Sequence, residues 1–127
     1  MIGYVTLGVN DVDRGRAFYD ALLAEVGAKQ MMAMEENGFT MYGTAWDKPA
    51  IVITRPYDGG AAQPGNGNMV ALQMDSREKV DALHAKALEL GGSCEGPPGV
   101  REPAEMGFYG AYFRDPEGNK LCAFKVG

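Results

Sequence analysis

The side chains best suited to covalent chemistry in this sequence are two cysteines, Cys94 and Cys122, and the single histidine, His84. A cysteine nucleophile needs a base within hydrogen-bonding reach, and His84 is the one imidazole that could serve. Apolar periodicity around His84 predicts a helix with His84 at the edge of its buried stripe, whereas Cys122 lies in a predicted strand. The pattern therefore favours a histidine on the surface or flank of its helix over a Cys–His catalytic pair. Without a CxxC spacing, both thiols are expected to be reduced.

Cys122 belongs to a predicted β-hairpin that spans residues 108–127. Aromatic residues fill its first strand, and Asp115-Pro116-Glu117-Gly118 has the residue types of a tight turn. The return strand, Lys120–Val126, is expected to direct Cys122 and Phe124 toward the side of the sheet where a ligand could bind.

The first half of the chain predicts one strand, one helix and three further strands. Alternating apolar residues predict a strand over 4–9, and Asn10 or Asp11 can cap a helix that continues to about Val26. Three short strands are then predicted, at residues 29–35, 39–45 and 50–55. Residues 56–68 are dense in glycine and proline and predict a linker or a mobile loop.

The same order of elements recurs in the second half. A strand is predicted over residues 69–74, and Ser76 caps a helix that ends at Gly91-Gly92. Cys94 begins a strand that the proline- and glycine-rich residues 96–103 are expected to interrupt before the hairpin. An offset of 65 residues superposes Val5 on Val70, Leu7 on Leu72, Val9 on Met74, Phe18 on Leu83 and Gly27 on Gly92. An internal duplication explains this match.

Two stretches resemble the glyoxalase/bleomycin-resistance/dioxygenase group, the vicinal oxygen chelate superfamily. They are Val5-Thr6-Leu7-Gly8-Val9, which leads into Arg16-Ala17-Phe18-Tyr19, and the ending from Tyr109 to Lys120. The resemblance implies an α+β fold in which two βαβββ modules form a curved mixed-sheet cup with the helices outside. It covers residues 1–127 as one glyoxalase-like domain, with module one at 1–57, a linker loop at 58–67 and module two at 68–127.

The resemblance also identifies four positions at which metal-using members carry histidine, glutamine or glutamate. Here they are Tyr4, Ile53 (to within a residue or two), Met69 and Cys122. Divalent metals prefer imidazole and carboxylate, whereas these positions offer a phenol, an alkane, a thioether and a thiol. A thiolate beside a thioether could suit Cu(I), but the sequence favours no metal and no other cofactor.

Strand parity indicates which other side chains line the cup. Val5, Leu7 and Val9 are expected to pack on the helix, so that alternate residues face the other way. The predicted ligand pocket comprises Tyr4, Thr6, Tyr42, Trp46, Ile53, Arg55, Met69, Gln73, Tyr109, Cys122 and Phe124. Such a mostly apolar set with a few polar groups is typical of small-molecule pockets. The alternatives are a cup collapsed into core and a solvated loop around Arg55.

The net charge of −5 argues against nucleic-acid binding, which needs a basic surface. No apolar run approaches the roughly 18 residues that span a bilayer, and the N-terminus lacks a signal-peptide pattern. We therefore expect a cytoplasmic protein without nucleic-acid or membrane partners. The superfamily resemblance implies a homodimer, because an unmatched module edge is often covered by another subunit.

Two functions are compatible with these features, besides a purely structural or interaction role. The favoured one is a metal-free member of the superfamily that binds a small apolar or aromatic molecule, as a sequestering, resistance-type or accessory protein. The alternative is a glyoxalase-type lyase, isomerase or dioxygenase with an atypical metal site or Tyr/Cys acid–base chemistry. A metal site would require Glu35, Glu36, Asp58 or Glu105 to reach the cup. Metal content and ligand-induced fluorescence changes of Trp46 would distinguish these functions.

Overall fold

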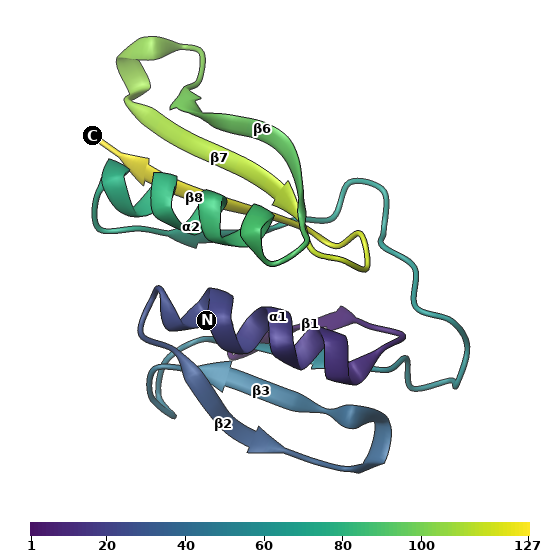
Figure 1. The fold of residues 1–127 in the computed structure, drawn as a ribbon. Helices are drawn as coiled ribbons and strands as arrows, with labels where there is room; N and C mark the ends of the chain where they lie inside the picture. The colour runs from purple at the N-terminus through teal and green to yellow at the C-terminus, as the bar shows by residue number, and fades with distance from the viewer. The chain divides into compact units, whose positions relative to one another are not determined.

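The computed structural model describes residues 1–127, and the chain forms two compact units, Met1–Pro64 and Gly65–Gly127. The first unit, called module one below, contains β1 (Tyr4–Gly8), α1 (Val12–Ala24), β2 (Lys29–Ala33), β3 (Thr40–Gly43) and β4 (Ala50–Thr54). The second, module two, contains β5 (Val70–Gln73), α2 (Arg77–Glu89), β6 (Ser93–Val100), β7 (Phe108–Arg114) and β8 (Lys120–Val126) (Figure 1). The predicted pair of βαβββ modules is confirmed, and two unpredicted 3₁₀ turns occur at Glu36–Gly38 and Ala104–Met106.

The two sheets have the same topology. Their strand orders are β1-β4-β3-β2 and β5-β8-β7-β6, so the first strand of each module lies beside its last strand. That pair is parallel in both modules, and the other neighbours are antiparallel. A parallel pair needs a long crossover connection, which in each module includes the helix.

Both helices begin at predicted capping residues. The Asp11 carboxylate accepts a hydrogen bond from the Arg14 amide at 3.0 Å, and the Ser76 hydroxyl accepts one from the Lys79 amide at 3.2 Å. Each bond satisfies one of the backbone N–H groups that a helix leaves unpaired at its start. Of the two cap candidates in module one, Asp11 therefore caps α1.

The predicted interruption after Cys94 is wrong, because β6 continues through its glycines and prolines to Val100. Its register with β7 shifts between Cys94 and Gly96 and again between Gly96 and Gly99. β6 is an edge strand of its sheet, and edge strands tolerate proline and bulges because one side needs no hydrogen-bonded partner.

One face of each sheet packs against the helix of the same module. In module one the rings of Tyr19 on α1 and Tyr42 on β3 lie 6.3 Å apart, and in module two His84 on α2 and Phe113 on β7 lie 6.4 Å apart. Tyr19 and His84 are separated by the 65-residue repeat offset. The largest fully buried side chains include Tyr19, Tyr42, Phe18, Phe113, Leu22, Leu23, Ile53 and Leu83.

Candidate functional site

The sheet face that no helix of its own module covers, called the open face below, is defined by strand register. In module one Thr6 pairs with Val52 and Gly8 with Thr54, and these residues alternate with Leu7 and Ile53 on the helix side. Tyr4 has the same parity as Thr6, so both predicted site residues lie on this open face. The side chains of Tyr4 and Thr6 are exposed, whereas Val52, on β4 between β1 and β3, is fully buried.

The open face of module two contains three of the predicted site residues, Gln73, Cys122 and Phe124. Register pairs Ala71 with Cys122 and Gln73 with Phe124, and across the hairpin it pairs Tyr112 with Cys122. Tyr112 was not predicted as a site residue. The turn at residues 115–119 could have indicated it. That turn pairs Arg114 with Lys120 and thereby sets the strand register that places Tyr112 opposite Cys122.

Three predicted pocket residues lie on the helix-covered faces instead, so their predicted placement is wrong. The Tyr42 hydroxyl donates to the Asp20 carboxylate of α1 at 2.8 Å, and the Tyr109 hydroxyl donates to the Asp81 carboxylate of α2 at 2.6 Å. Ile53 is fully buried, and its Cδ1 would lie 3.0 Å from a Cβ at Gly15 of α1. In each case strand parity directs the side chain to the helix.

Trp46 and Met69 lie outside the strands. Trp46 is 71% exposed in the connection between β3 and β4, at the sheet end opposite to Thr54. Met69 immediately precedes β5 and is 44% exposed. Trp46 is therefore poorly placed to report on a ligand bound near the far end of β4.

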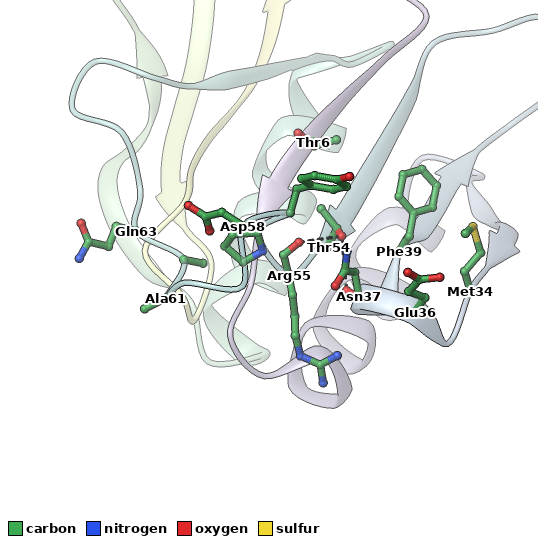
Figure 2. A pocket seen from close by; sticks show the side chains of 14 residues that line it. Thr6, Met34, Glu36, Asn37, Phe39, Thr54, Arg55, Asp58, Ala61 and Gln63 are labelled. Atoms are coloured by element: carbon green, nitrogen blue, oxygen red, sulfur yellow. Dashed lines mark hydrogen bonds between the residues drawn. The ribbon is translucent and has the colours of Figure 1, made fainter.

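A pocket of about 740 Å³ lies in module one, beside the ends of β1 and β4. Figure 2 shows Met34, Glu36, Asn37 and Phe39 on one side of it and Asp58, Ala61 and Gln63 on the other. Its apolar lining comes from Met34, Phe39, Pro56, Tyr57, Ala61 and Ala62. Thr6 and Arg55 are the only predicted site residues among those that line it.

The far wall of this pocket is the loop that follows β4, and Asn10 holds it in place. The Asn10 side chain donates to the Ala62 carbonyl at 3.2 Å and accepts from the Ala62 amide at 2.7 Å. We call this pair of bonds the Asn10–Ala62 clip. A Cβ at Gly8 would lie 3.1 Å from that of Ala62, so the loop approaches β1 closely. Residues up to Pro64 thus belong to module one rather than to a free linker.

Cys122 is fully buried on the open face of module two, opposite Tyr112, and its thiol donates to the Ala123 carbonyl at 3.6 Å. Burial raises the pKa of the Cys122 thiol, and burial also raises the pKa of the Tyr112 hydroxyl. Both groups therefore stay protonated near neutral pH, and neither is poised to act as a base or a nucleophile.

His84 is buried, although the sequence favoured a surface or flank position. Its ring contacts Phe113 on the helix-covered side of the sheet, opposite to the face that carries Cys122. The sheet itself therefore separates His84 from Cys122, and the two side chains do not form a catalytic pair.

Comparison with known proteins identifies the family. The family model described as Glyoxalase/Bleomycin resistance protein/Dioxygenase superfamily matches residues 1–123. The chain belongs to this superfamily. A glyoxalase/bleomycin resistance protein from Albidiferax ferrireducens T118 is 38% identical, with 98% of each chain covered and a TM-score of 0.86.

More distant superfamily structures share the fold. A glyoxalase-related enzyme from Fulvimarina pelagi is 19% identical, with 98% of this chain and 87% of that chain covered and a TM-score of 0.76. Lactoylglutathione lyase from Agrobacterium tumefaciens is 18% identical, with 98% and 92% covered and a TM-score of 0.69. No curated protein matches the sequence. No helix is long and apolar enough to cross a membrane.

The register corrects one of the four positions at which metal-using members of the superfamily carry ligands. Thr6 and Ala71 are equivalent in the repeat, and they pair with Val52 and Cys122 respectively. Val52, not Ile53, is thus the module-one counterpart of Cys122.

The residues at these positions do not fit a divalent metal. Tyr4, Val52, Met69 and Cys122 supply no imidazole and no carboxylate, which such ions prefer. Nowhere in residues 1–127 do three or more histidine, cysteine, aspartate or glutamate side chains form a group that could hold a metal ion.

Proposed function

We propose that this superfamily member binds a small apolar or aromatic molecule and does so without a divalent metal. The pocket of module one is the observation that carries the proposal. Its volume of about 740 Å³ lies within the range of small-molecule sites, about 300–1,000 Å³. Phe39 and the exposed Tyr57 are the aromatic residues that line the pocket, and Met34 adds an adaptable thioether.

Polar side chains also line the pocket and are suited to orienting a ligand; they are Thr6, Glu36, Asn37, Thr54, Arg55, Asp58 and Gln63. Thr6 on β1 and Thr54 on β4 both line it, and Thr54 already donates to the Asn37 carbonyl at 3.4 Å. The Asn10–Ala62 clip holds the loop wall before any ligand arrives. A pre-formed wall favours binding, because less conformational entropy is lost when the complex forms.

The absence of a metal is proposed from the donor chemistry at the four ligand positions. An enzyme that relied instead on Tyr/Cys acid–base chemistry would need one of its groups ionised near neutral pH. The raised pKa values of Tyr112 and Cys122 oppose that alternative.

The binding proposal is tested with a tryptophan placed in the pocket. In the variant Trp46→Phe/Tyr57→Trp, titration with N-phenyl-1-naphthylamine, a neutral apolar aromatic probe, should quench the new tryptophan with saturation. Wild-type protein is the matched control, because Trp46 lies at the other end of the sheet and should respond little. Equal responses from the two proteins, or no response from the tryptophan introduced in the pocket, would overturn the proposal.

The metal-free part is tested separately by elemental analysis of protein purified without chelators, together with thermal unfolding in the presence and absence of EDTA. We expect less than about 0.1 equivalent of any transition metal and no change in Tm, since a bound metal stabilises the folded state by mass action. A stoichiometric metal that EDTA removes, with a fall in Tm, would make an enzyme the leading interpretation.

We also propose a homodimer. Each four-stranded sheet has two edge strands, and exposed edges favour association. Sedimentation equilibrium at micromolar concentration tests this, and a mass of one chain would contradict it.

A further inference from the structure

The open face of module two carries an aromatic platform. The rings of Phe108 on β7 and Phe124 on β8 stack 5.2 Å apart with planes only 7° from parallel, and both side chains are partly exposed. Gly110 lies opposite Phe124, and a Cβ there would lie 2.6 Å from the Phe108 ring. The glycine thus leaves the space that the Phe108 ring occupies beside Phe124. A stacked, partly exposed ring pair can take a third ring against it.

Two cations lie next to this platform. The Arg101 guanidinium is 5.2 Å and the Lys120 ammonium 5.5 Å from the centre of the Tyr112 ring. Tyr112 is two residues along β7 from Gly110, and Cys122 is two residues along β8 from Phe124. Two residues of a strand span about 7 Å. Tyr112, over which both cations lie, is thus about 7 Å along the strand from Gly110, which is about the length of a fused aromatic ring system.

Neither cation forms an ion pair with a carboxylate, although the chain as a whole carries a net charge of −5. Arg101 is fixed instead by backbone, because its guanidinium donates to the Gly99 carbonyl at 2.9 Å and the Pro97 carbonyl at 2.6 Å. Arg114, a third cation on the same face, is by contrast paired with Glu95. A guanidinium that is held in place without a counter-ion retains donors for an incoming anion.

We infer that the open face of module two binds an aromatic carboxylate, with its ring on Phe108 and Phe124 and its carboxylate between Arg101 and Lys120. The carboxylate is favoured because guanidinium and ammonium donors to an ionised acceptor make the stronger kind of hydrogen bond. Cys122, buried beneath this surface with a neutral thiol, contributes no charge that would repel the anion. This inference goes beyond the proposed function, because it concerns module two alone and requires a charged ligand.

The test compares 2-naphthoate with its neutral isostere 2-naphthamide by isothermal titration calorimetry on the full chain. We expect 2-naphthoate to bind at least about tenfold more tightly at low salt and to lose affinity as salt rises. Amide shifts in ¹H–¹⁵N spectra should change at Tyr112 and Phe124. The substitutions Arg101→Gln and Lys120→Gln should each weaken 2-naphthoate about fivefold to tenfold and leave 2-naphthamide unchanged.

Lys125→Gln is the matched control. Lys125 lies on β8 but pairs with Tyr109, which is on the helix-covered side, so this variant should bind 2-naphthoate like the wild type. Equal affinity for acid and amide, or equal losses in all three lysine and arginine variants, would overturn the inference. Failure of 2-naphthoate to bind would overturn it as well, and a change in the sedimentation of Lys120→Gln would then show that a second copy of the chain covers this face. The pocket titration with Tyr57→Trp uses a neutral probe on module one, so its outcome is independent of these results.

Discussion

The two modules share a fold and the packing of their helix-covered faces, but their open faces differ. On the helix-covered side they match: Tyr19 and Tyr42 in module one occupy the places of His84 and Phe113 in module two, at ring separations of 6.3 and 6.4 Å. On the open side they differ, because module one has a pocket closed by a loop and module two has an aromatic and cationic surface.

A duplicated fold is free to vary where its side chains have no obligatory partner. A helix and a sheet must bury their shared face, so substitutions there preserve volume and ring packing. Open-face residues have no such partner within the module, and they differ in charge and shape. Even there, the strand centre stays apolar, since Val52 and Cys122 are equivalent and both fully buried.

The two thiols of module two should differ most. Cys94 is exposed, while Cys122 is fully buried with a raised pKa. Exposure of Cys122 requires an opening that approaches global unfolding, which for small domains costs about 5 kcal/mol or more. With 5,5′-dithiobis(2-nitrobenzoate) at pH 8, Cys94 should react at least about 10³-fold faster than Cys122.

The assignment of the two phases is checked by substitution. Cys94→Ser should remove the fast phase and Cys122→Ser the slow one. Similar rates for both thiols would contradict a packed strand centre on the open face of module two.

Two glycines at equivalent places should respond unequally to alanine. Gly38 and Gly107 both have φ of +67° and both precede a phenylalanine. A Cβ at Gly38 would lie 2.4 Å from a Val12 methyl on α1, whereas at Gly107 the closest atom is a backbone nitrogen at 3.2 Å. Gly38→Ala adds overpacking to the backbone strain and should cost about 3 kcal/mol of unfolding free energy, against about 1–2 kcal/mol for Gly107→Ala.

Urea unfolding monitored by circular dichroism measures both values. A larger loss in Gly107→Ala would show that module two, rather than module one, has the tighter contact between its 3₁₀ turn and the remaining structure.

The Asn10–Ala62 clip should matter only for module one. Asn10→Ala removes two hydrogen bonds of the loop wall, so we expect a stability loss of about 1–2 kcal/mol. In the Trp46→Phe/Tyr57→Trp background, affinity for N-phenyl-1-naphthylamine should also fall about fivefold. A fivefold change is about 1 kcal/mol, which is the expected cost of ordering the loop wall when the probe binds. Asp75 is the repeat counterpart of Asn10 and forms only an exposed pair with Lys79.

Asp75→Ala is therefore the control. An exposed pair contributes about 0–1 kcal/mol, and the probe affinity should not change. If Asn10→Ala also left the affinity unchanged, the loop would not be the wall that shapes the pocket.

Much of the fold followed from local pattern. The caps at Asp11 and Ser76 and the hairpin turn have direct signatures in their residue types, and all three are present. The repeat offset of 65 residues located both first strands and both helices. These features depend on neighbours in sequence, which is why the sequence alone was sufficient for them.

The site was less predictable, because the register between distant strands decides on which face of the sheet a side chain lies. A one-residue slip moves a side chain to the other face, and this is the error at Tyr42, Ile53 and Tyr109. The pocket also uses residues carried by a turn, since Asn37 adopts φ of 57° and precedes Phe39. The Asn37-Gly38 pair was a visible signal for that turn, but only the folded chain brings Phe39 to the loop beyond β4.

The smallest expected effect is a pH dependence of folding stability that arises from His84 in module two and has no counterpart in module one. Burial lowers the pKa of His84 below its usual value of 6.5, and its Nε2 has no hydrogen-bond partner. Asp81, the acidic group nearby, opposes this shift only in part, and its carboxylate already accepts from Tyr109. The unfolded chain therefore binds a proton that the folded chain excludes, so stability should fall as pH decreases below 6.5.

His84→Tyr substitutes the residue that module one has at the equivalent place, Tyr19, and should remove this part of the pH dependence. The measurement is urea unfolding at about pH 7.5, 6.5 and 5.5, a range centred on the ordinary histidine pKa, compared between variant and wild type. Below about pH 5 the carboxylates contribute as well, so the comparison is confined to the range in which histidine titrates. If the two proteins lost stability in parallel, the His84 Nε2 atom would be reaching water. His84 and Tyr19 would then match in their ring packing but not in their burial.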